Sequence, residues 1–407
     1  MTYLPRFLEK KLLDYGTWFR AVLLLGARQV GKTTLLKHLY PDMKMITFDP
    51  VLDVHGARRD PDLFLDSFPA PLILDEIQYV PELFPALKRR IDESDKKGQY
   101  FLSGSQNPLL LRQVAESMAG RVGILELDEL HPEELRGHGD CLPWLHPWLG
   151  SEGTADPTRY QTQASKQQSL LSILWRGGLP GILELPDRAV QPYLNSYFHT
   201  YIERDVRLAG EVRDIDSFGR FVALCAALSG QEVNRAQLGR DIGVAAVTAQ
   251  KWLEILRMTY QWHELPAYSG NTVKRLSGKA KGYFSDTGLA CLLQRLSSDE
   301  ALGVSPLKGA FFETLVINGL RQQQAVLPSL TGMYHWRTTG GAEVDAVLEL
   351  DGKHYLVECK CTTQLSRHDL RGIMAFRATY QECAPAVIVY AGHECRKLDD
   401  WTLAIPL

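Results

Sequence analysis

Cysteine is scarce in this sequence and is not arranged for disulfide or metal chemistry. The chain has seven cysteines among its 407 residues, an odd number, and no two of them are spaced as CxxC. This pattern excludes a disulfide framework and a zinc site of the common kind. Scattered, reduced thiols are typical of a cytoplasmic protein, and we expect this location.

Long apolar runs and an excess of positive charge are also missing. No apolar run approaches the ~20 residues that a membrane-spanning helix needs. The N-terminal stretch MTYLPRFLEKKLLDYG lacks the uninterrupted apolar core of a signal peptide. The 45 basic and 48 acidic residues give a net charge of -3 and a sequence pI of about 6.4. Any contact with nucleic acid must therefore be local, and we expect no contact with a membrane.

Two common hydrolase motifs are absent as well. The sequence contains no GxSxG and no HExxH, so a serine-hydrolase nucleophile elbow and a zinc metalloprotease helix find no support. The composition, 45% hydrophobic and 23% charged, is ordinary for a globular protein. A chain of this length is expected to hold two or three domains, each with its own core.

The most specific stretch that is present is AVLLLGARQVGKTTLLKHLYP, which begins at residue 21. Its first five residues are apolar and predict a buried parallel strand. The next residues fit G-x-x-x-x-G-K-[ST] and lead into a helix that we expect to stop at Pro41. In such a loop backbone amides cradle phosphates, the lysine reaches the β- and γ-phosphates, and the hydroxyl holds Mg²⁺. The predicted nucleotide-binding residues are Gly26, Ala27, Arg28, Gln29, Val30, Gly31, Lys32, Thr33 and Thr34.

Two further apolar segments end in polar residues suited to nucleotide hydrolysis. PLILDEIQ places Asp75 at a strand tip, where it can hold the magnesium ion, and Glu76 beside it, where it can polarise the attacking water. QYFLSGSQNPLL ends a third strand with four polar residues, any of which can sense the γ-phosphate. They are Ser103, Ser105, Gln106 and Asn107.

The order of these motifs resembles one branch of the P-loop ATPases. GARQVGKTTLL, DEIQ, GS and AGRV follow one another as in a bacterial and archaeal branch of the AAA-type ATPases. The resemblance covers residues 1–205, with a helical lid at its end and an irregular loop or insertion at 136–168. It implies ATP and Mg²⁺ as ligands, Ser105 as the sensor, and Arg121 as an arginine that acts on the nucleotide, commonly that of a neighbour in a homo-oligomer. A surface salt bridge is the alternative role for Arg121.

The middle of the chain resembles a winged helix-turn-helix. Residues 211–295 contain a short helix, a turn through Gly243 and a longer amphipathic helix, followed by VKRLSGKAKGYF, which has the character of a glycine-interrupted strand. In such a domain the second helix enters a major groove and the wing meets phosphates. The basic residues in those positions are Lys251, Lys274, Arg275, Lys279 and Lys281. A winged helix that only separates two domains stays open as the alternative.

The last region contains a hairpin with an unusual arrangement of charge. In EVDAVLELDGKHYLVECK, residues 343–360, apolar and polar residues alternate on both sides of Asp351-Gly352, which predicts a two-residue turn. Leu350 then pairs with Lys353, and each step back along one strand advances one step along the other.

This register sets Asp345 opposite Glu358, and Glu343 opposite Lys360. Side chains alternate between faces, so we expect these four residues to share a face with Val347 and Leu356, while Val344 and its alternating neighbours share the other. Directly opposed side chains lie about 5 Å apart, where like charges destabilise a sheet. Water, Lys360 or a divalent cation can offset the repulsion.

The hairpin residues resemble the active site of the PD-(D/E)xK, or restriction-endonuclease-like, nucleases. The resemblance implies that Asp345 and Glu358 hold a metal ion, Mg²⁺ or Mn²⁺, and that Lys360 stabilises charge on a phosphate. Glu313, in the helical stretch GAFFETLVINGL, is the acid from a preceding helix that many members add. Val344 stands where the name-giving proline is found in that family. We expect this nuclease-like region to span residues 300–407.

These patterns predict an α/β chain with a P-loop parallel sheet and lid, then a winged helix, then a restriction-endonuclease-like domain. The expected function is Mg²⁺-dependent ATP hydrolysis coupled to a nuclease-like domain that acts on nucleic acid, with DNA favoured. The alternative is a nucleotide-dependent regulatory switch whose C-terminal domain is a catalytically silent module that binds DNA or protein.

Overall fold

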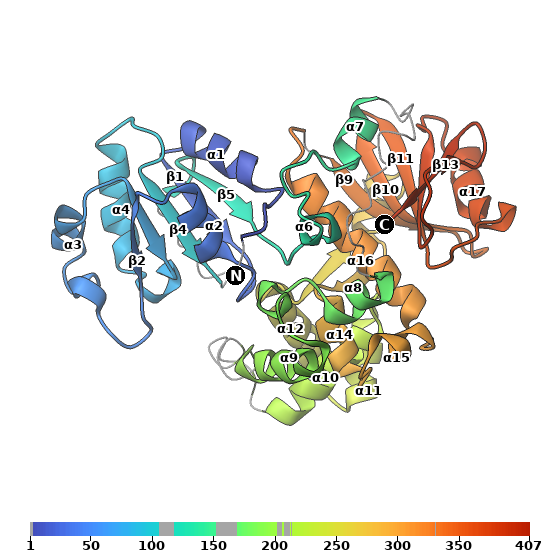
Figure 1. The fold of residues 1–407 in the computed structure, drawn as a ribbon, viewed down its shortest axis with the longest axis horizontal. Coiled ribbons are helices and arrows are strands. Elements are labelled where there is room, and N and C mark those ends of the chain that lie inside the picture. The colour runs from blue at the N-terminus through green and yellow to red at the C-terminus, as the bar shows by residue number, and fades with distance from the viewer. Residues whose placement is uncertain are drawn as a thin grey trace.

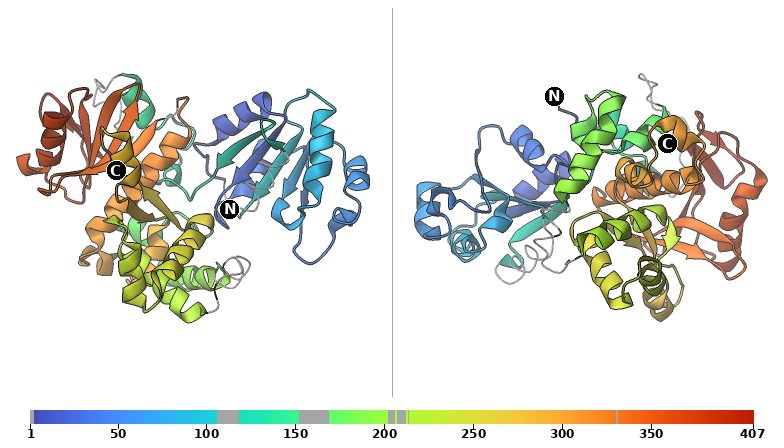
Figure 2. Two further views of the ribbon diagram at one scale, coloured as in Figure 1. Left: turned by 180° about the vertical axis from the view of Figure 1, so that it is seen from behind. Right: turned by 90° about the horizontal axis from the view of Figure 1, so that it is seen from below.

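The computed structural model describes most of the chain. The described residues are 3–105, 118–151, 169–201, 206, 212, 214–329 and 331–407. The views in Figures 1 and 2 agree that the N-terminal sheet and the C-terminal sheet lie towards opposite ends of the long axis. None of the described helices is both long enough and apolar enough to cross a membrane.

The N-terminal region is built on a sheet of five parallel strands. They are β1 (Ala21–Leu25), β2 (Lys44–Thr47), β3 (Leu72–Asp75), β4 (Tyr100–Gly104) and β5 (Val122–Glu126), in the order β2-β3-β4-β1-β5. Three strands were predicted from apolar runs in the sequence, and β1, β3 and β4 confirm them. They lead to the phosphate loop, to Asp75 and Glu76, and to Ser105. Because the strands are parallel, the polar residues that follow them gather at one edge of the sheet.

Helices cover both faces of this sheet. Ala21, Leu23 and Leu25 of β1 are buried on one face, and Val22 and Leu24 on the other, as expected for a central strand. The helices of this region are α1 (Glu9–Trp18), α2 (Lys32–Leu39), α3 (Pro61–Ser67) and α4 (Leu83–Asp92).

Within the described residues, five helices follow the first sheet and lead into the middle of the molecule. They are α6 (Pro132–Leu135), α7 (Leu145–Gly150), α8 (Leu170–Arg176), α9 (Asp187–Tyr201) and α10 (Ile215–Ala227). The middle region then adds α11 (Arg235–Ile242), α12 (Ala246–Met258), α13 (Thr272–Ser277), α14 (Thr287–Leu293) and α15 (Asp299–Gly303). Its strands β6 (Gln231–Glu232), β7 (Trp262–Leu265) and β8 (Lys281–Phe284) form a small antiparallel sheet in the order β6-β8-β7.

The turn between α11 and α12 lies where the sequence predicts it, but the following segment differs. Gly243 ends α11 with φ of 82°, a conformation that favours glycine. Residues 272–277 form the helix α13, so the strand character expected from VKRLSGKAKGYF is confirmed only for β8.

The C-terminal region contains a six-stranded mixed sheet in the order β13-β14-β12-β11-β10-β9. The strands are β9 (Gly332–Arg337), β10 (Glu343–Leu350), β11 (Lys353–Lys360), β12 (Ala386–Tyr390), β13 (Arg396–Lys397) and β14 (Thr402–Pro406). The helices α16 (Lys308–Ala325) and α17 (Arg371–Thr379) pack on opposite faces. The chain is thus an α/β protein with a parallel N-terminal sheet followed by helical and mixed-sheet regions.

The predicted hairpin register is confirmed from the turn to Ala346, and a bulge interrupts the pairing of β10 with its other neighbour. Leu350 pairs with Lys353, and Ala346 pairs with Val357. Between Val344 and residue 347, however, the pairing of β10 with β9 shifts by a β-bulge. A bulge turns the side chains that follow or precede it to the other face of the sheet, which changes the surroundings of the acids at this end of the hairpin.

One hydrophobic core joins helices α7 and α8, the middle region and the C-terminal sheet. Trp148 of α7, Leu174 of α8, Phe284 of β8, Phe311 of α16 and Val357 of β11 are all buried in it. The N-terminal sheet has its own two clusters of core residues. The residues of this shared core all follow β5 in the chain, and they pack as one unit. The N-terminal sheet keeps a core of its own beside it.

Candidate functional sites at the phosphate loop and in an acidic cluster

The loop after β1 has a backbone that only certain residues can adopt. Gly26 and Gly31 have φ of 149° and 101°, and Gln29 has φ of 62°. A Cβ atom on Gly26 would lie 2.1 Å from the carbonyl oxygen of Leu127. The first glycine of the motif is thus required by both its conformation and its close approach to the segment after β5.

The lysine of the motif is buried against this loop. Lys32 is the first residue of α2 and is 5% exposed. Its Nζ donates hydrogen bonds to the carbonyl oxygens of Gly26 (2.9 Å) and Ala27 (2.7 Å). The ammonium is therefore held directly over the loop, at the N-terminus of the helix where anions bind.

The hydroxyl of Thr33 and the carboxylate of Asp75 meet at the same edge of the sheet. Thr33 Oγ1 donates to Asp75 Oδ2 over 3.0 Å, and Ser103 Oγ donates to Asp75 Oδ1. Thr47 Oγ1 also donates to Asp75 Oδ2 over 3.3 Å. Adjacent hydroxyl and carboxylate oxygens are the ligands that Mg²⁺ prefers, so these residues fit the ion that the motif implies.

Glu76 lies in a strained conformation beside the sensor residue that the sequence suggested. Its φ is 56°, which is unusual for a residue other than glycine and clusters at functional sites. Gln78 Nε2 donates to Glu76 Oε2 and, over 3.2 Å, to Ser105 Oγ, and that hydroxyl lies 3.4 Å from Glu76 Oε2. The structure thus brings Glu76 and Ser105 together through Gln78. The other two candidates for the sensor, Gln106 and Asn107, lie outside the described residues.

Residues far from the motif in sequence hold the loop in place. Arg6 is buried, donates from Nη1 to the carbonyl oxygen of Val30 (2.9 Å), and pairs with Glu134 through Nε (2.9 Å). Tyr193 of helix α9 donates to Gln29 Oε1 over 2.6 Å. The roles of Arg6, Gln78 and Tyr193 were not predicted from the sequence. Only Gln78 carried a local signal, as part of DEIQ.

The structure places Arg121 away from the phosphate loop of its own chain. It precedes β5, and its carbonyl oxygen accepts from the amide of Ala21, the first residue of β1. The phosphate loop follows the last residue of β1, about 16 Å away along five strand residues. The guanidinium pairs with Asp92, as in the salt-bridge alternative, and its side chain is 35% exposed. A role on a neighbour's nucleotide stays a prediction.

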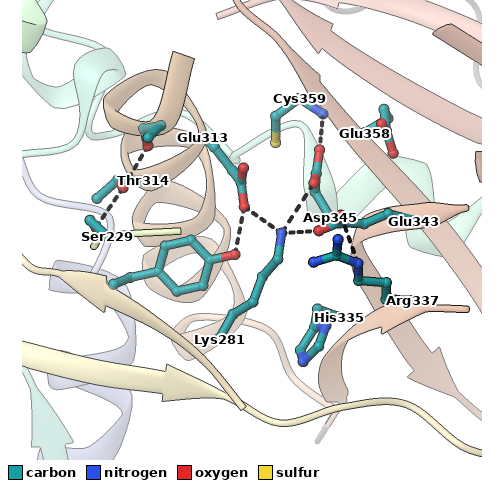
Figure 3. A network of polar contacts seen from close by, with 12 residues as sticks. Ser229, Lys281, Glu313, Thr314, His335, Arg337, Glu343, Asp345, Glu358 and Cys359 are labelled. Atoms are coloured by element: carbon teal, nitrogen blue, oxygen red, sulfur yellow. Dashed lines mark hydrogen bonds and ion pairs between the residues drawn. The ribbon is translucent and has the colours of Figure 1, made fainter. Parts of the chain in front are cut away.

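The C-terminal region contains a second site, in which a lysine lies among three carboxylates. Figure 3 shows the ammonium of Lys281 between Glu313, Glu343 and Asp345. Lys281 Nζ lies 2.9 Å from Glu313 Oε1 and 3.5 Å from Asp345 Oδ1, and it pairs with Glu343 Oε1. Lys281 is 3% exposed. The opposite charges raise its pKa above the usual value, against the effect of burial.

The two hairpin acids do not oppose each other as an uninterrupted ladder predicts. Val344 packs in the same core cluster as Val347 and Leu356, so the predicted faces are wrong at this end of β10. Because of the bulge, Asp345 turns towards Lys281, and its Oδ2 accepts from the amide of Cys359 over 2.8 Å. Strand alternation leaves Glu358 on the face of Leu356.

Glu358 is nevertheless close enough to Asp345 for their charges to interact. Burial and the charge of Asp345 raise the pKa of Glu358 well above its usual value. Lys360 Nζ pairs with Glu358 Oε1 at 2.5 Å. Glu358 Oε2 is buried and has no hydrogen-bond partner within the part of the chain that the structure describes.

The metal site predicted from Asp345, Glu358 and Glu313 is not formed in this arrangement. Among the described residues, no group of three or more His, Cys, Asp or Glu side chains is placed to hold a metal ion. The position between Glu313 and Asp345 is taken by the ammonium of Lys281. The sequence placed Lys281 in a wing, and no local pattern indicates that it points into the interior.

The expected phosphate contacts of the middle region are wrong for two of its five basic residues. Lys281 is buried, and Arg275 pairs with Glu349 (2.6 Å) and stacks on the rings of Tyr268 and Tyr334. Both residues therefore bind the C-terminal region. Lys251 and Lys279 are exposed, and the side chain of Lys274 is outside the described part of the chain. These contacts favour the alternative in which the middle region connects its neighbours.

Known protein families match three successive parts of the chain. Residues 19–136 match the family described as "AAA domain", and this domain is the P-loop ATPase type that the motifs indicate. Residues 167–300 match "Domain of unknown function (DUF8612)", and residues 308–407 match "Domain of unknown function (DUF4143)". None of these matches contains a nuclease assignment.

Similar proteins are found in mycobacteria and archaea. The "Walker-type ATPase" PABY2304 of Pyrococcus abyssi has a TM-score of 0.44 and 15% identity over 70% of this chain and 94% of its own. "Uncharacterized protein Rv2008c" of Mycobacterium tuberculosis and "Uncharacterized protein Mb2031c" of Mycobacterium bovis are each 30% identical over 386 residues, which cover 95% of this chain and 79% of theirs. The chain therefore belongs to the family of these mycobacterial proteins, with an AAA-type P-loop ATPase domain at its N-terminus.

Proposed function

We propose that this protein binds ATP with Mg²⁺, hydrolyses it, and uses its nucleotide state to control the position of its C-terminal region. The observation that carries the proposal is the convergence of Lys32, the Thr33–Asp75 pair and the Glu76–Ser105 pair at one edge of the parallel sheet. They come from the ends of β1, β3 and β4, and together they supply the groups that phosphoryl transfer to water requires.

The residues divide the work as follows. Lys32 and the loop amides hold the phosphates, and Thr33 and Asp75 would hold Mg²⁺, which neutralises phosphate charge when it is bound. Glu76 orients the attacking water and accepts its proton. Gln78 holds Glu76 and Ser105 in fixed relation, so that Ser105 reports the state of the γ-phosphate to the acid.

Contacts between α16 and the segment after β5 support the control of the C-terminal region. Arg321 of α16 pairs with Asp128, and Gln322 Nε2 donates to the carbonyl oxygen of Glu129 over 3.2 Å. Arg6 donates to the carbonyl oxygens of both Asp128 and Glu129 while it also holds Val30 of the phosphate loop. A change in the loop therefore reaches α16 through one buried guanidinium.

Replacement of the loop lysine tests the ATPase assignment. Lys32→Ala removes the cation that reaches the phosphates, so we expect ATP hydrolysis to fall to background. Lys37→Ala, at an exposed position on the same helix, is the matched control and should keep the wild-type rate. Phosphate release from the purified full chain measures both. Normal turnover by the Lys32 variant contradicts the assignment.

A second candidate function is metal-dependent cleavage of nucleic acid, with DNA favoured, by the C-terminal region. It is supported by the gathering of Glu313, Asp345 and Glu358, from α16, β10 and β11, with Lys360 beside them. The test is cleavage of labelled single- and double-stranded DNA and RNA with Mg²⁺ or Mn²⁺, with and without ATP, comparing wild type with Glu358→Ala.

The two outcomes separate the candidates for this region. Cleavage that is lost in the Glu358 variant supports the nuclease, and its dependence on ATP measures the coupling to the first domain. No cleavage of any substrate, alongside normal ATP hydrolysis, leaves the C-terminal region as a non-catalytic module that binds DNA or protein.

A further inference from the structure

The geometry of Lys281 is that of a cation held by ligands, not of a lysine with one partner. An ammonium group has three N–H donors and no acceptor. Its three carboxylate partners, Glu313, Glu343 and Asp345, match that number. Tyr283 OH donates to the same Glu313 Oε1 over 2.8 Å. The lysine therefore satisfies three acids at once, which come from α16 and β10.

The surroundings of the ammonium carry more negative than positive charge. Glu358 adds a fourth carboxylate whose Oε2 is buried without a hydrogen-bond partner among the described residues. Lys360 pairs with Glu358, and Arg337 lies 3.9 Å from Glu343 with a side chain that is 49% exposed. Such a cluster strongly requires a cation, because buried carboxylates are costly unless they are paired.

The cation comes from a different part of the chain than its ligands. Lys281 begins β8 of the middle region, and the acids belong to the C-terminal region. Other contacts fix the segments next to β8 there. Ser229 and Thr314 share a hydrogen bond of 2.7 Å, and His335 Nε2 lies 2.9 Å from the carbonyl oxygen of Lys279. Lys281 can leave the cluster only if β8 moves relative to α16 and β10.

We propose that Lys281 is the resident cation of this cluster and keeps divalent metal out, so that removal of its ammonium leaves carboxylates that bind a divalent cation; the proposal rests on the metal site of the second candidate function. Carboxylate oxygens are the ligands of hard divalent ions. An ammonium at 2.9 Å from Glu313 and 3.5 Å from Asp345 occupies the place such an ion needs. The middle region is thus a built-in inhibitor of the C-terminal metal site.

Manganese titration of the nucleotide-free full chain, followed by electron paramagnetic resonance, tests this proposal. Wild type is expected to show no Mn²⁺ site that depends on Asp345. Lys281→Met is expected to gain one such site per chain, with affinity at least tenfold higher than any wild-type binding. Lys281→Met combined with Asp345→Asn should lose it again. Lys279→Met, which removes an exposed lysine two residues away, is the matched control and should behave as wild type.

The design separates this proposal from the others. Manganese bound at Thr33 and Asp75 contributes equally in every variant, so dependence on Asp345 is the readout. If the Met variant does not fold, Lys281→Gln keeps N–H donors towards the acids and is read in the same way. An Asp345-dependent site of equal affinity in wild type, or none in a folded Lys281 variant, overturns the proposal. A gained site without cleavage of nucleic acid supports it and removes only the nuclease candidate.

Discussion

Glu129 makes the stability of the protein depend on pH in a direction that can be worked out. This residue follows β5 at the junction with α16, and it is 7% exposed. Burial, followed by the charges of Asp128 and Asp286, raises its pKa from 4.5 to about 8, and Arg321 opposes the shift. The folded protein therefore keeps the proton that the unfolded chain has released.

The sign and size of the effect follow from this difference in pKa. Folding is penalised progressively as the pH rises from 4.5 towards 8, because the folded state must either hold the proton or bury the charge. At 1.36 kcal/mol for each pKa unit, the penalty reaches up to about 5 kcal/mol above pH 8. Glu129→Gln cannot ionise, so it should gain stability over wild type by that amount at pH 8.5 and by little at pH 5.

Urea denaturation at a series of pH values, followed by tryptophan fluorescence, measures this prediction. The quantity of interest is the difference in unfolding free energy between Glu129→Gln and wild type. Exposed Glu82 provides the matched control, since its replacement by Gln removes the same charge from the surface and should leave the pH dependence unchanged. A difference that stays constant or shrinks as the pH rises would refute the reasoning.

Three further predictions concern the N-terminal domain. Gly26→Ala should weaken ATP binding at least tenfold in a titration with a fluorescent analogue, because the new Cβ meets the carbonyl oxygen of Leu127 at 2.1 Å. An affinity equal to that of wild type would show that the loop can move aside. Arg6→Ala should lower the unfolding free energy by about 3–5 kcal/mol in urea, since it leaves Glu134 buried without its cation; a loss under 1 kcal/mol argues against a buried pair. Arg121→Ala should leave the rate of ATP hydrolysis unchanged at low protein concentration. It should lower that rate only at concentrations where the rate per chain of wild type has risen. A lower rate in the isolated monomer would mean that Arg121 acts on the nucleotide of its own chain.

Features set by neighbouring residues were predictable from the sequence. The strand–loop–helix order around Lys32 and the turn at Asp351 depend on local spacing and on residues with special backbone conformations, and both appear where they were expected. The acid pair after β3 was predictable for the same reason, because a polar residue that ends a buried parallel strand must lie at the edge of the sheet.

Features set by distant partners were not predictable. The bulge before Val347 depends on β9, and it turns Asp345 towards a lysine 64 positions earlier in the chain. Lys281 looks like a surface residue because it lies in a basic stretch, and only the packing of β8 against α16 buries it. Arg121 has the right neighbours in sequence for a catalytic arginine, yet the parallel arrangement of β1 and β5 places it at the wrong end of the sheet.

The shared core of α7, α8, β8, α16 and β11 also limits how this protein can be divided into fragments. A piece that begins at Lys308 would expose Phe311 and the other apolar residues that α16 buries against Phe284 and Leu174. Such a surface promotes aggregation. Fragments that are to be expressed alone should therefore keep the middle and C-terminal regions on one polypeptide, and an N-terminal fragment should extend through α6 so that Glu134 stays with Arg6.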